Sequence, residues 1–220
     1  MNFLKRINRD IEVVFERDPA ATTKLEVVLN YPGLHAIWAH RLTHKLYQKN
    51  LRVLARFLSQ VARFFTQVEI HPGAELGEGL FIDHGCGIVI GETAVVGKNV
   101  TLYQGVTLGG TGKESGKRHP TVGDNVMISS GAKVLGNINI GNNVKIGAGS
   151  VVLKDVPDNC TVVGIPGRVV VRDGLRVKTD AHHVDLNHNQ LPDPVDDCLR
   201  ALSFRMDAVA SRIKELEEKL

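Results

Sequence analysis

A six-residue period of apolar side chains runs through the middle of the sequence and limits the possible folds more than any other feature. Residues at this spacing are Ile70, Leu76, Ile82, Ile88, Ala94, Val100 and Val106, and after an interruption Val122, Ile128, Val134, Ile140, Ile146 and Val152. Six is a multiple of the two-residue repeat of a strand but not of the 3.6-residue repeat of a helix. A unit this short must stack on its neighbours to bury its apolar side chain. The period therefore predicts a β-solenoid.

One interruption of the period predicts a loop that leaves the solenoid wall. Val106 and Val122 are 16 residues apart, where an unbroken period would give 12 or 18. The stretch between them, residues 109–120, is rich in glycine and charge and ends with Arg118, His119 and a proline. Long loops in a compact repeat domain are usually functional or disordered, and the Arg-His pair favours a function.

The residues before the repeats predict a helical cap over positions 1–66. Apolar residues recur at helical spacing in the segments 3–17, 34–46 and 51–65. The first helix is expected to end near Asp18, because Pro19 disfavours helical conformation in the residue before it. With the solenoid over residues 67–171, the fold is expected to be α+β.

The C-terminal part of the sequence divides into a polar segment and an apolar heptad pattern. Residues 172–194 are predicted to form a linker, since their histidines and aspartates match no zinc-ligand spacing. From Val195 to Leu220, apolar residues step alternately by four and three, as in a coiled coil. An amphipathic helix is therefore predicted over residues 195–220. It would either join subunits or lie on the body of its own chain.

The composition argues against nucleic-acid and membrane partners. The formal net charge of +3 is too small to indicate nucleic-acid binding. The N-terminal residues lack the apolar region of a signal peptide, and no uncharged run is long enough to span a bilayer. Three widely spaced cysteines disfavour a disulfide framework. A cytoplasmic location is expected.

His84 is the candidate general base. It follows Asp83 directly after an inward-facing position, in a stretch of small residues that leaves room for a ligand. Glu69 precedes His84 by 15 residues, close to the 18 of a three-sided coil, so the two should lie near one another on adjacent coils. A carboxylate there can orient an imidazole that takes a proton from a hydroxyl. A histidine on a coil without such neighbours is more often structural.

The glycine-rich loop favours anion binding rather than nucleotide binding. Arg118 and His119 are donors suited to hold a carboxylate through charge-assisted hydrogen bonds. A P-loop needs glycine where position 107 is threonine, and a dinucleotide fingerprint needs its third glycine where position 90 is isoleucine. Neither nucleotide motif is present at these positions.

Together these residues resemble the serine acetyltransferases, left-handed parallel β-helix enzymes of the hexapeptide-repeat acyltransferase superfamily. The resemblance runs from about Ile11 to Arg168. Its most specific stretches are residues 16–20, 68–72, 82–85, 87–94, 106–113, 118–120 and 164–166. The resemblance implies transfer of acetyl from acetyl-CoA to the hydroxyl of L-serine, without a metal. The products would be O-acetyl-L-serine and CoA, in the first step of cysteine biosynthesis.

The resemblance also implies roles for individual residues. His84 would be the general base, Glu69 falls on the position of the family's aspartate partner, and Asp83 is the nearer carboxylate by sequence. Asp18 and Asp83 match positions that hold the serine amino group, while Arg118 and His119 match those near its carboxylate. The matching acetyl-CoA positions are Gly110, Thr111, Ser130, Lys145 and Ala148.

By the same resemblance the chain should form a homotrimer whose subunit contacts build the site. A dimer of trimers and feedback inhibition by L-cysteine are further possibilities. Many family members end in an isoleucine that enters the next enzyme of the pathway, whereas this sequence ends in Leu220. That partner is therefore not assumed for this chain.

Three alternatives stay open at the level of sequence. A hexapeptide acetyltransferase of this kind could act on another small hydroxyl or amino acceptor. A trimeric β-helix carbonic anhydrase needs two zinc-binding histidines five residues apart, but the position five past His119 is Asp124. A non-catalytic scaffold would not need the Asp-His pair and the Arg-His loop together.

Overall fold

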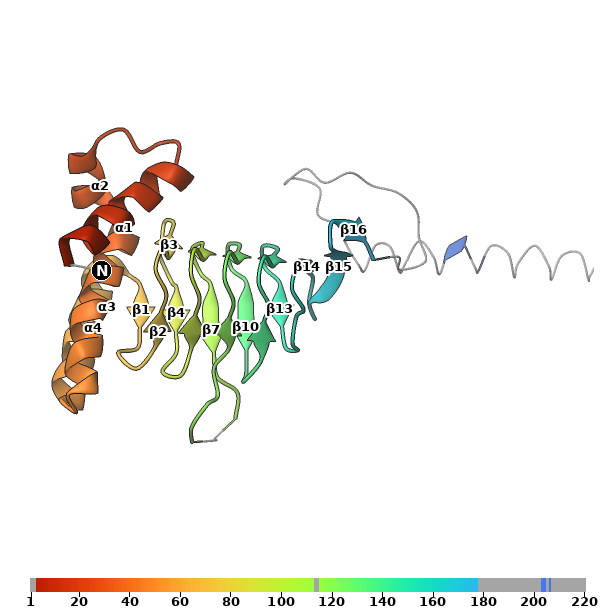
Figure 1. The fold of residues 1–220 in the computed structure, drawn as a ribbon. Coiled ribbons are helices and arrows are strands. Elements are labelled where there is room, and N and C mark those ends of the chain that lie inside the picture. Colours follow the sequence, from red (N-terminus) through yellow and green to blue (C-terminus); the bar gives the residue numbers. More distant parts are fainter. Residues whose placement is uncertain (1–2, 113–114, 178–202, 205, 207–220) are drawn as a thin grey trace, which may run out of the picture.

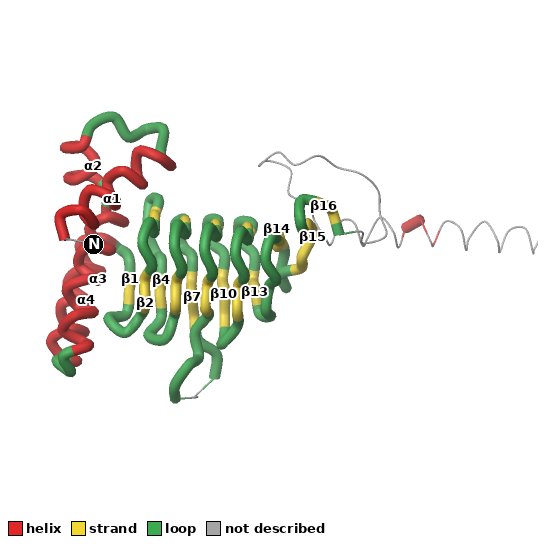
Figure 2. Tube along the Cα trace, viewed as in Figure 1, coloured by secondary structure: helices red, strands yellow, loops and turns green. Residues whose placement is uncertain are grey.

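The computed structural model describes residues 3–112, 115–177, 203–204 and 206. Helices at the N-terminal end precede a solenoid of short strands whose coils stack along one axis (Figure 1). Figure 2 shows the change from the helical part to alternating strands and turns. The predicted helix over residues 195–220 lies outside the described residues apart from 203–204 and 206. The predicted linker lies outside them apart from residues 172–177.

The described part of the helical cap contains one more helix than the sequence predicted. The helices are α1 (Phe3–Arg17), α2 (Lys24–Asn30), α3 (Pro32–Gln48) and α4 (Arg52–Thr66). α1, α3 and α4 match the predicted segments, and α1 ends just before the Asp18-Pro19 pair. The sequence analysis missed α2, although Thr23 and Glu26 form a capping box at its start. In the part of the chain that the structure describes, no helix is both long and apolar enough to cross a bilayer.

The solenoid consists of three sheets that the chain visits in turn. Sheet A contains β1 (Glu69–Ile70), β4 (Val89–Ile90), β7 (Thr107–Gly109), β10 (Lys133–Leu135) and β13 (Val151–Val152). Sheet B contains β2 (Glu75–Leu76), β5 (Val95–Val96), β8 (Thr121–Val122) and β11 (Asn139–Ile140). Sheet C contains β3 (Phe81–Ile82), β6 (Thr101–Leu102), β9 (Met127–Ile128), β12 (Lys145–Ile146), β14 (Cys160–Val163), β15 (Arg168–Arg172) and β16 (Leu175–Arg176). The strands pair in parallel until β14, β15 and β16, which pair antiparallel. β16 lies in the range predicted as a linker.

The turns between sheets form columns of corners along the solenoid. The C–A corner, between sheets C and A, comprises residues 83–88, 103–106, 129–132 and 147–150. The A–B corner comprises residues 71–74, 91–94, 110–120 and 136–138. The third corner contains a ladder of asparagines with φ values of 56–57°, namely Asn99, Asn125, Asn143 and Asn159. Asparagine tolerates this left-handed conformation better than most residues do.

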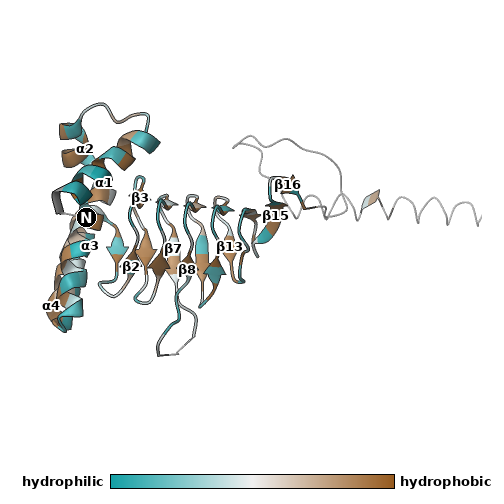
Figure 3. Ribbon diagram, viewed as in Figure 1, coloured by the Kyte–Doolittle hydropathy of each residue, from teal (hydrophilic) through white to brown (hydrophobic). Residues whose placement is uncertain are grey.

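Two interleaved rows of apolar side chains fill the solenoid, and Figure 3 shows apolar colour along its strands. One row lies on the strands, as at Ile90 and Leu102, and the other lies two residues before them, as at Ile88 and Val100. These four side chains are fully buried. Burial of one such side chain stabilises the fold by roughly 1.5–3 kcal/mol.

The register of sheet A corrects the period inferred from the sequence. Ile70 pairs with Ile90 and Ile90 with Leu108, so the first coil has 20 residues and the second has 18. The sequence analysis missed the two extra residues in the turn 83–88. Its six-residue period ran from Ile82, which lies on a strand, to Ile88, which belongs to the row two residues before the strands, and so skipped Ile90. Leu108 pairs with Val134, 26 positions on, so the coil with the protruding loop has eight more residues than a coil of 18.

A buried ion pair joins α1 to α3 in the cap. Arg41 of α3 contacts both carboxylate oxygens of Asp10 in α1, at 2.5 and 2.7 Å. The indole N–H of Trp38 donates to the same carboxylate at 2.9 Å. Asp10 is only 5% exposed, so its charge depends on these donors.

We expect Asp10→Asn to lower the free energy of unfolding by about 3–5 kcal/mol, because it removes the buried negative charge to which Arg41 and Trp38 both donate. Glu16→Gln removes the exposed partner of Arg9 in the same way and is the matched control, with an expected loss below about 1 kcal/mol. Urea denaturation followed by the fluorescence of Trp38, the single tryptophan, measures both losses. Equal losses in the two variants would contradict this difference.

Candidate active site

His84 lies on the C–A corner, in the turn with the two extra residues. Its φ of 58° is in the left-handed region, which is uncommon for residues other than glycine. Gly85 and Gly87 follow with φ values of 74°. Backbone strain of this kind is found often at functional sites. The extended turn exposes the imidazole, of which 72% is accessible to solvent.

Asp83 provides the only carboxylate within 4 Å of His84 among the described residues. Its Oδ1 lies 3.9 Å from Nε2 of His84, which is too long for a hydrogen bond. Glu69, the predicted partner of His84, forms an ion pair with Arg63 of α4 at 3.3 Å. The carbonyl of Gln67 accepts the backbone N–H of Gly87 in the turn 83–88. Glu69 follows Gln67 by two residues and therefore lies close to this turn. Its pairing with His84 stays a prediction.

Asp18 is held in place at the end of α1 by two donors. Its Oδ1 accepts the N–H of Ala20 at 2.8 Å, and its Oδ2 accepts the hydroxyl of Tyr31 at 2.6 Å. Burial raises the pKa of Tyr31 far above its usual value. The hydrogen bond to Asp18 and the charges of Asp18 and Asp83 raise this pKa further. Both carboxylates predicted to hold the serine ammonium group therefore lie near one hydroxyl.

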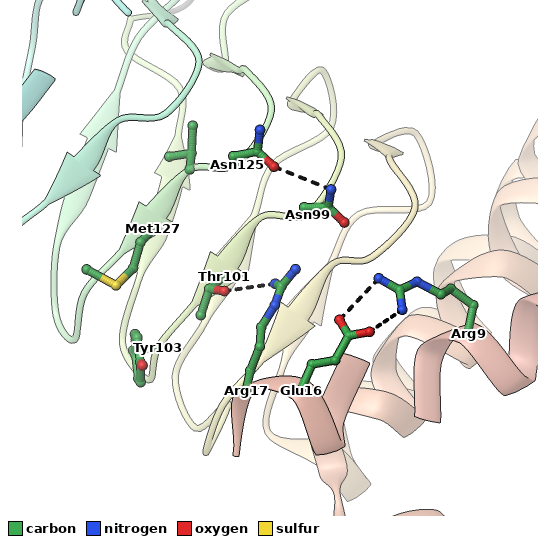
Figure 4. Close-up of a pocket in the computed structure, with 9 residues that line it drawn as sticks. Arg9, Glu16, Arg17, Asn99, Thr101, Tyr103, Asn125 and Met127 are labelled. Atoms are coloured by element: carbon green, nitrogen blue, oxygen red, sulfur yellow. Dashed lines mark hydrogen bonds and ion pairs between the residues drawn. The ribbon is translucent and has the colours of Figure 1, made fainter. Parts of the chain in front are cut away.

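A groove of about 480 Å³ lies between α1 and sheet C. One of its lining residues, Arg17, directly precedes Asp18 in the sequence. Figure 4 shows Arg17 reaching from α1 to Thr101, where Nη1 donates to Oγ1 at 2.9 Å. Arg9 and Glu16 pair on the same helix. None of the predicted site residues lines this groove. Its relevance is that Arg17 fixes the end of α1 against the solenoid and so positions Asp18.

Arg118 lies on the A–B corner, at the end of the protruding loop. Its Nη2 donates to Oε2 of Glu92 at 2.5 Å, and the hydroxyl of Tyr47 donates to Oε1 of the same carboxylate at 2.9 Å. The hydrogen bond from Arg118, followed by that from Tyr47, lowers the pKa of Glu92 below its usual value. A guanidinium has five N–H donors. Arg118 can therefore bind a second carboxylate while Glu92 holds it.

His119 is buried beside Arg118 and faces the glycines of this corner. Its Nδ1 lies 3.2 Å from the backbone N of Thr93, which donates to it, so the proton of the neutral ring is on Nε2. Burial lowers the pKa of His119, and the charge of Arg118 lowers it further. A Cβ at position 91 would lie 2.0 Å from this ring, so Gly91 leaves the space that the ring occupies. The Nε2–H is a donor at the corner.

The sequence analysis missed the side chains that hold these groups. Tyr31 and Tyr47 have no charge or motif that marks them as parts of a site, and neither Glu92 nor Thr93 was assigned a role. The signal for Glu92 and Thr93 was their place in the stretch 87–94, which the resemblance already contained. The role of the tyrosines follows only from the packing of α3 against both corners.

The predicted site residues divide between two corners of the chain. Asp18, Asp83 and His84 gather at the C–A corner, whereas Arg118 and His119 lie at the A–B corner. Sheet A lies between these corners, and Figure 1 shows the loop of the A–B corner extending from the end of β7, beyond one end of the strands of that sheet. A single chain therefore does not bring the two groups together.

The predicted acetyl-CoA positions divide in the same way. Gly110 and Thr111 are exposed on the loop of the A–B corner. Ser130 and Ala148 lie on the C–A corner, and exposed Lys145 lies in the adjoining strand β12. The backbone N–H of Gly149 donates to the carbonyl of Ser130, so the coils that contain Ser130 and Ala148 are direct neighbours. They lie in the same column as His84, further along the axis.

Position 124 bears on the zinc alternative. Asp124, at the position that would need a histidine, accepts the backbone N–H of Lys98 at 2.7 Å on the third corner. Within residues 3–112 and 115–177, no group of three histidine, cysteine, aspartate or glutamate side chains is arranged to hold a metal ion.

Comparison with known proteins identifies the family. The family model described as "Serine acetyltransferase, N-terminal" matches residues 1–39, and "Bacterial transferase hexapeptide (six repeats)" matches residues 119–154. The serine acetyltransferase of Bacillus pumilus is 58% identical over 217 residues, covering 99% of this chain and 98% of the relative.

Solved structures of longer relatives have the same fold. Serine acetyltransferase from Neisseria gonorrhoeae is 50% identical with a TM-score of 0.75, covering 80% of this chain and 66% of its own. This chain therefore spans slightly less than two thirds of that relative. A serine acetyltransferase from Brucella abortus in complex with coenzyme A is 49% identical with a TM-score of 0.75, covering 79% of this chain and 69% of its own.

These matches establish the predicted α+β fold, with helices before a left-handed parallel β-helix. They also identify acetyl-CoA as the acetyl donor and L-serine as the acceptor, in the first step of cysteine biosynthesis. The chain belongs to the serine acetyltransferase family.

Proposed function

We propose that this chain makes O-acetyl-L-serine at sites shared between neighbouring subunits of a homotrimer. The observation that supports this is the division of the candidate residues between two corners. Acceptor binding needs carboxylates for the ammonium group and cationic donors for the carboxylate. One chain presents these two sets at opposite ends of the strands of sheet A. Threefold symmetry would join the C–A corner of one chain to the A–B corner of the next and close a ring.

In this proposal His84 is the general base. Its imidazole removes the hydroxyl proton of L-serine, and the resulting alkoxide attacks the thioester carbonyl of acetyl-CoA directly, without an acyl-enzyme. The same ring then protonates the departing thiolate of CoA. The exposure of His84 suits this role, because both substrates must reach the ring. Holding them side by side supplies a large share of the rate.

The two ends of L-serine would be bound by different subunits. Asp18 and Asp83 would hold the ammonium group beside His84. Arg118 and His119 of the next chain would hold the carboxylate, Arg118 through its remaining guanidinium donors and His119 through Nε2–H. A related solved structure contains serine, which supports an acceptor of this kind. An acceptor without an ammonium or a carboxylate group would lose one half of these contacts.

Acetyl-CoA would lie in the cleft between the same two corners. Ser130, Lys145 and Ala148 of one chain would contact it from the C–A side, with Gly110 and Thr111 of the neighbour opposite. The coils at Ser130 and Ala148 follow that of His84, with roughly 4.8 Å between neighbouring coils. An extended thiol ester could therefore run along the column and place its reactive end at His84.

Three further parts of the proposal concern assembly, regulation and location. Large apolar side chains are exposed on α4, including Phe57 at 65% and Phe64 at 80%, which leaves a surface on which two trimers could pair.

L-cysteine shares its amino and carboxylate groups with L-serine and is bound in a related solved structure, which supports feedback inhibition at this site. The supply of acetyl-CoA and the free thiols of Cys86 and Cys160 support a cytoplasmic location.

Release of CoA thiol from acetyl-CoA tests the activity. We expect release with L-serine, and much less with homoserine, threonine or a sugar, because only L-serine places its hydroxyl correctly between the two charged half-sites. A colorimetric thiol assay with each acceptor measures the ratio of kcat/KM. Turnover of another acceptor without turnover of L-serine would favour the alternative acetyltransferase.

We expect His84→Ala to lower kcat by roughly 10²–10⁴-fold, as loss of a general base does, while the assembly is unchanged. Glu69→Gln should lower kcat at least about tenfold with little change in the KM for L-serine, if Glu69 orients the imidazole.

Asp83→Asn should instead raise the KM for L-serine, because Asp83 is proposed to hold its ammonium group. Steady-state kinetics with light scattering for the molar mass separates these effects. Near-normal turnover of His84→Ala would refute its role.

Subunit mixing tests whether two chains build one site. His84→Ala and Arg118→Ala should each be nearly inactive at low L-serine concentration. Unfolding and refolding them together in equal amounts should restore sites at about one quarter of the subunit contacts, because those contacts join two intact corners. Sites built within one chain would show no recovery in the mixture. Each variant refolded alone is the control.

A further inference from the structure

We propose that the helical cap adjusts acceptor recognition through two tyrosines, Tyr31 and Tyr47, each of which positions a charged group for one end of L-serine. This inference rests on the proposed function and deepens it. Both tyrosines are positioning residues, since neither is proposed to touch the substrate. Tyr31 acts on Asp18 at the C–A corner, and Tyr47 acts on Glu92 and Arg118 at the A–B corner.

Tyr31 fixes the orientation of the Asp18 carboxylate. Its hydroxyl donates to Oδ2 at 2.6 Å while Ala20 donates to Oδ1, so both oxygens are held and each keeps a free lone pair. The raised pKa of Tyr31 keeps the hydroxyl protonated and therefore a donor. The nearby Asp83 adds a second negative charge. A substrate ammonium group is the cation that would complete this arrangement.

Tyr47 positions the cationic group Arg118 indirectly, through the carboxylate of Glu92. Its hydroxyl donates to Oε1 of Glu92, whose other oxygen accepts Arg118. The hydrogen bond to Glu92, together with burial, raises the pKa of Tyr47, so this hydroxyl also stays protonated. The ring of Tyr47 packs edge-on against His71 of the first A–B turn, with centroids 5.7 Å apart. Glu92 is thus fixed from two sides, and Arg118 is aimed by it.

One helix, α3, sets the positions of both tyrosines. Tyr31 is its N-cap residue and Tyr47 lies in its last turn. A helix of this length extends about 25 Å, enough to connect the two corners at the end of the solenoid. The turn at Gly33 contacts the backbone of Ile82 so closely that a Cβ would lie 2.2 Å from its carbonyl oxygen. This contact places Tyr31 directly beside the strand that leads to Asp83.

The two hydroxyls would serve different active sites of the trimer. The C–A corner of a chain faces one neighbour in the proposed assembly, and its A–B corner faces the other. α3 therefore contributes to two sites at once. Removing one hydroxyl should affect one end of the acceptor only, which a general loss of stability would not do.

Tyr31→Phe and Tyr47→Phe test the inference, with Trp38→Phe as the matched control. Trp38 also lies on α3 and donates to a carboxylate, but its partner Asp10 belongs to neither half-site, so its loss should leave the KM for L-serine unchanged. We expect each of the first two changes to raise the KM for L-serine by roughly 3–30-fold, with kcat within about threefold, because a charge-assisted hydrogen bond that orients a binding group is lost. The KM for acetyl-CoA should not change.

Two acceptor analogues assign each tyrosine to its end. L-Serinamide keeps the ammonium group and lacks the carboxylate charge, and 3-hydroxypropanoate keeps the carboxylate and lacks the ammonium group. Their inhibition constants against L-serine should show a reciprocal pattern. Tyr31→Phe should weaken L-serinamide only, and Tyr47→Phe should weaken 3-hydroxypropanoate only.

The L-serine KM decides the inference, and wild-type turnover separates it from the proposed function. No L-serine-dependent CoA release in the wild type would refute the function itself. Normal wild-type turnover with unchanged KM in both tyrosine variants would overturn the inference alone. An equal loss for all acceptors, together with a lower melting temperature, would also overturn it, because it would show a structural role.

Discussion

The structure depends on one constraint, the stacking of apolar side chains inside a narrow three-sided tube whose coils are bound in parallel register. Ile90, for example, pairs with Ile70 on one side and Leu108 on the other, and all three are buried. Extra residues cannot enter such an interior, so they must leave at the corners. The two insertions in sheet A's register are the turn 83–88 and the loop 110–120. Asp83, His84, Arg118 and His119 of the proposed site lie in these two insertions, whereas Glu69 lies on β1.

This arrangement is the physical basis for proposing a site shared between chains. The insertion at His84 projects from the C–A corner, and the loop with Arg118 projects from the A–B corner. Stacking keeps these columns apart along the whole tube, since sheet A separates them. Residues of opposite charge for the two ends of an amino acid can therefore meet only across a contact between chains. The rigid tube sets the spacing, and in the proposed trimer a neighbouring chain supplies the second half of the site.

The helical cap has a role in the site as well as in closing the end of the tube. Arg17 fixes α1 on sheet C and so places Asp18, while α3 contacts both corners through Tyr31 and Tyr47. The buried ion pair of Asp10 joins these two helices. In the proposed site the cap thus contributes part of the acceptor recognition, in addition to what the repeats provide.

The sequence by itself determined the repeat architecture, three of the four helices of the cap and the identity of the family, because apolar period and local motifs are properties of neighbouring residues. It also pointed to His84, Arg118 and His119, whose side chains are suited to acid–base chemistry and anion binding. Only the tertiary structure decided that the first coil is two residues longer, since Ile88 and Ile90 are equally apolar and hide the shift. The same holds for Tyr31 and Glu69, whose hydrogen bond and ion pair are set by packing between segments distant in sequence.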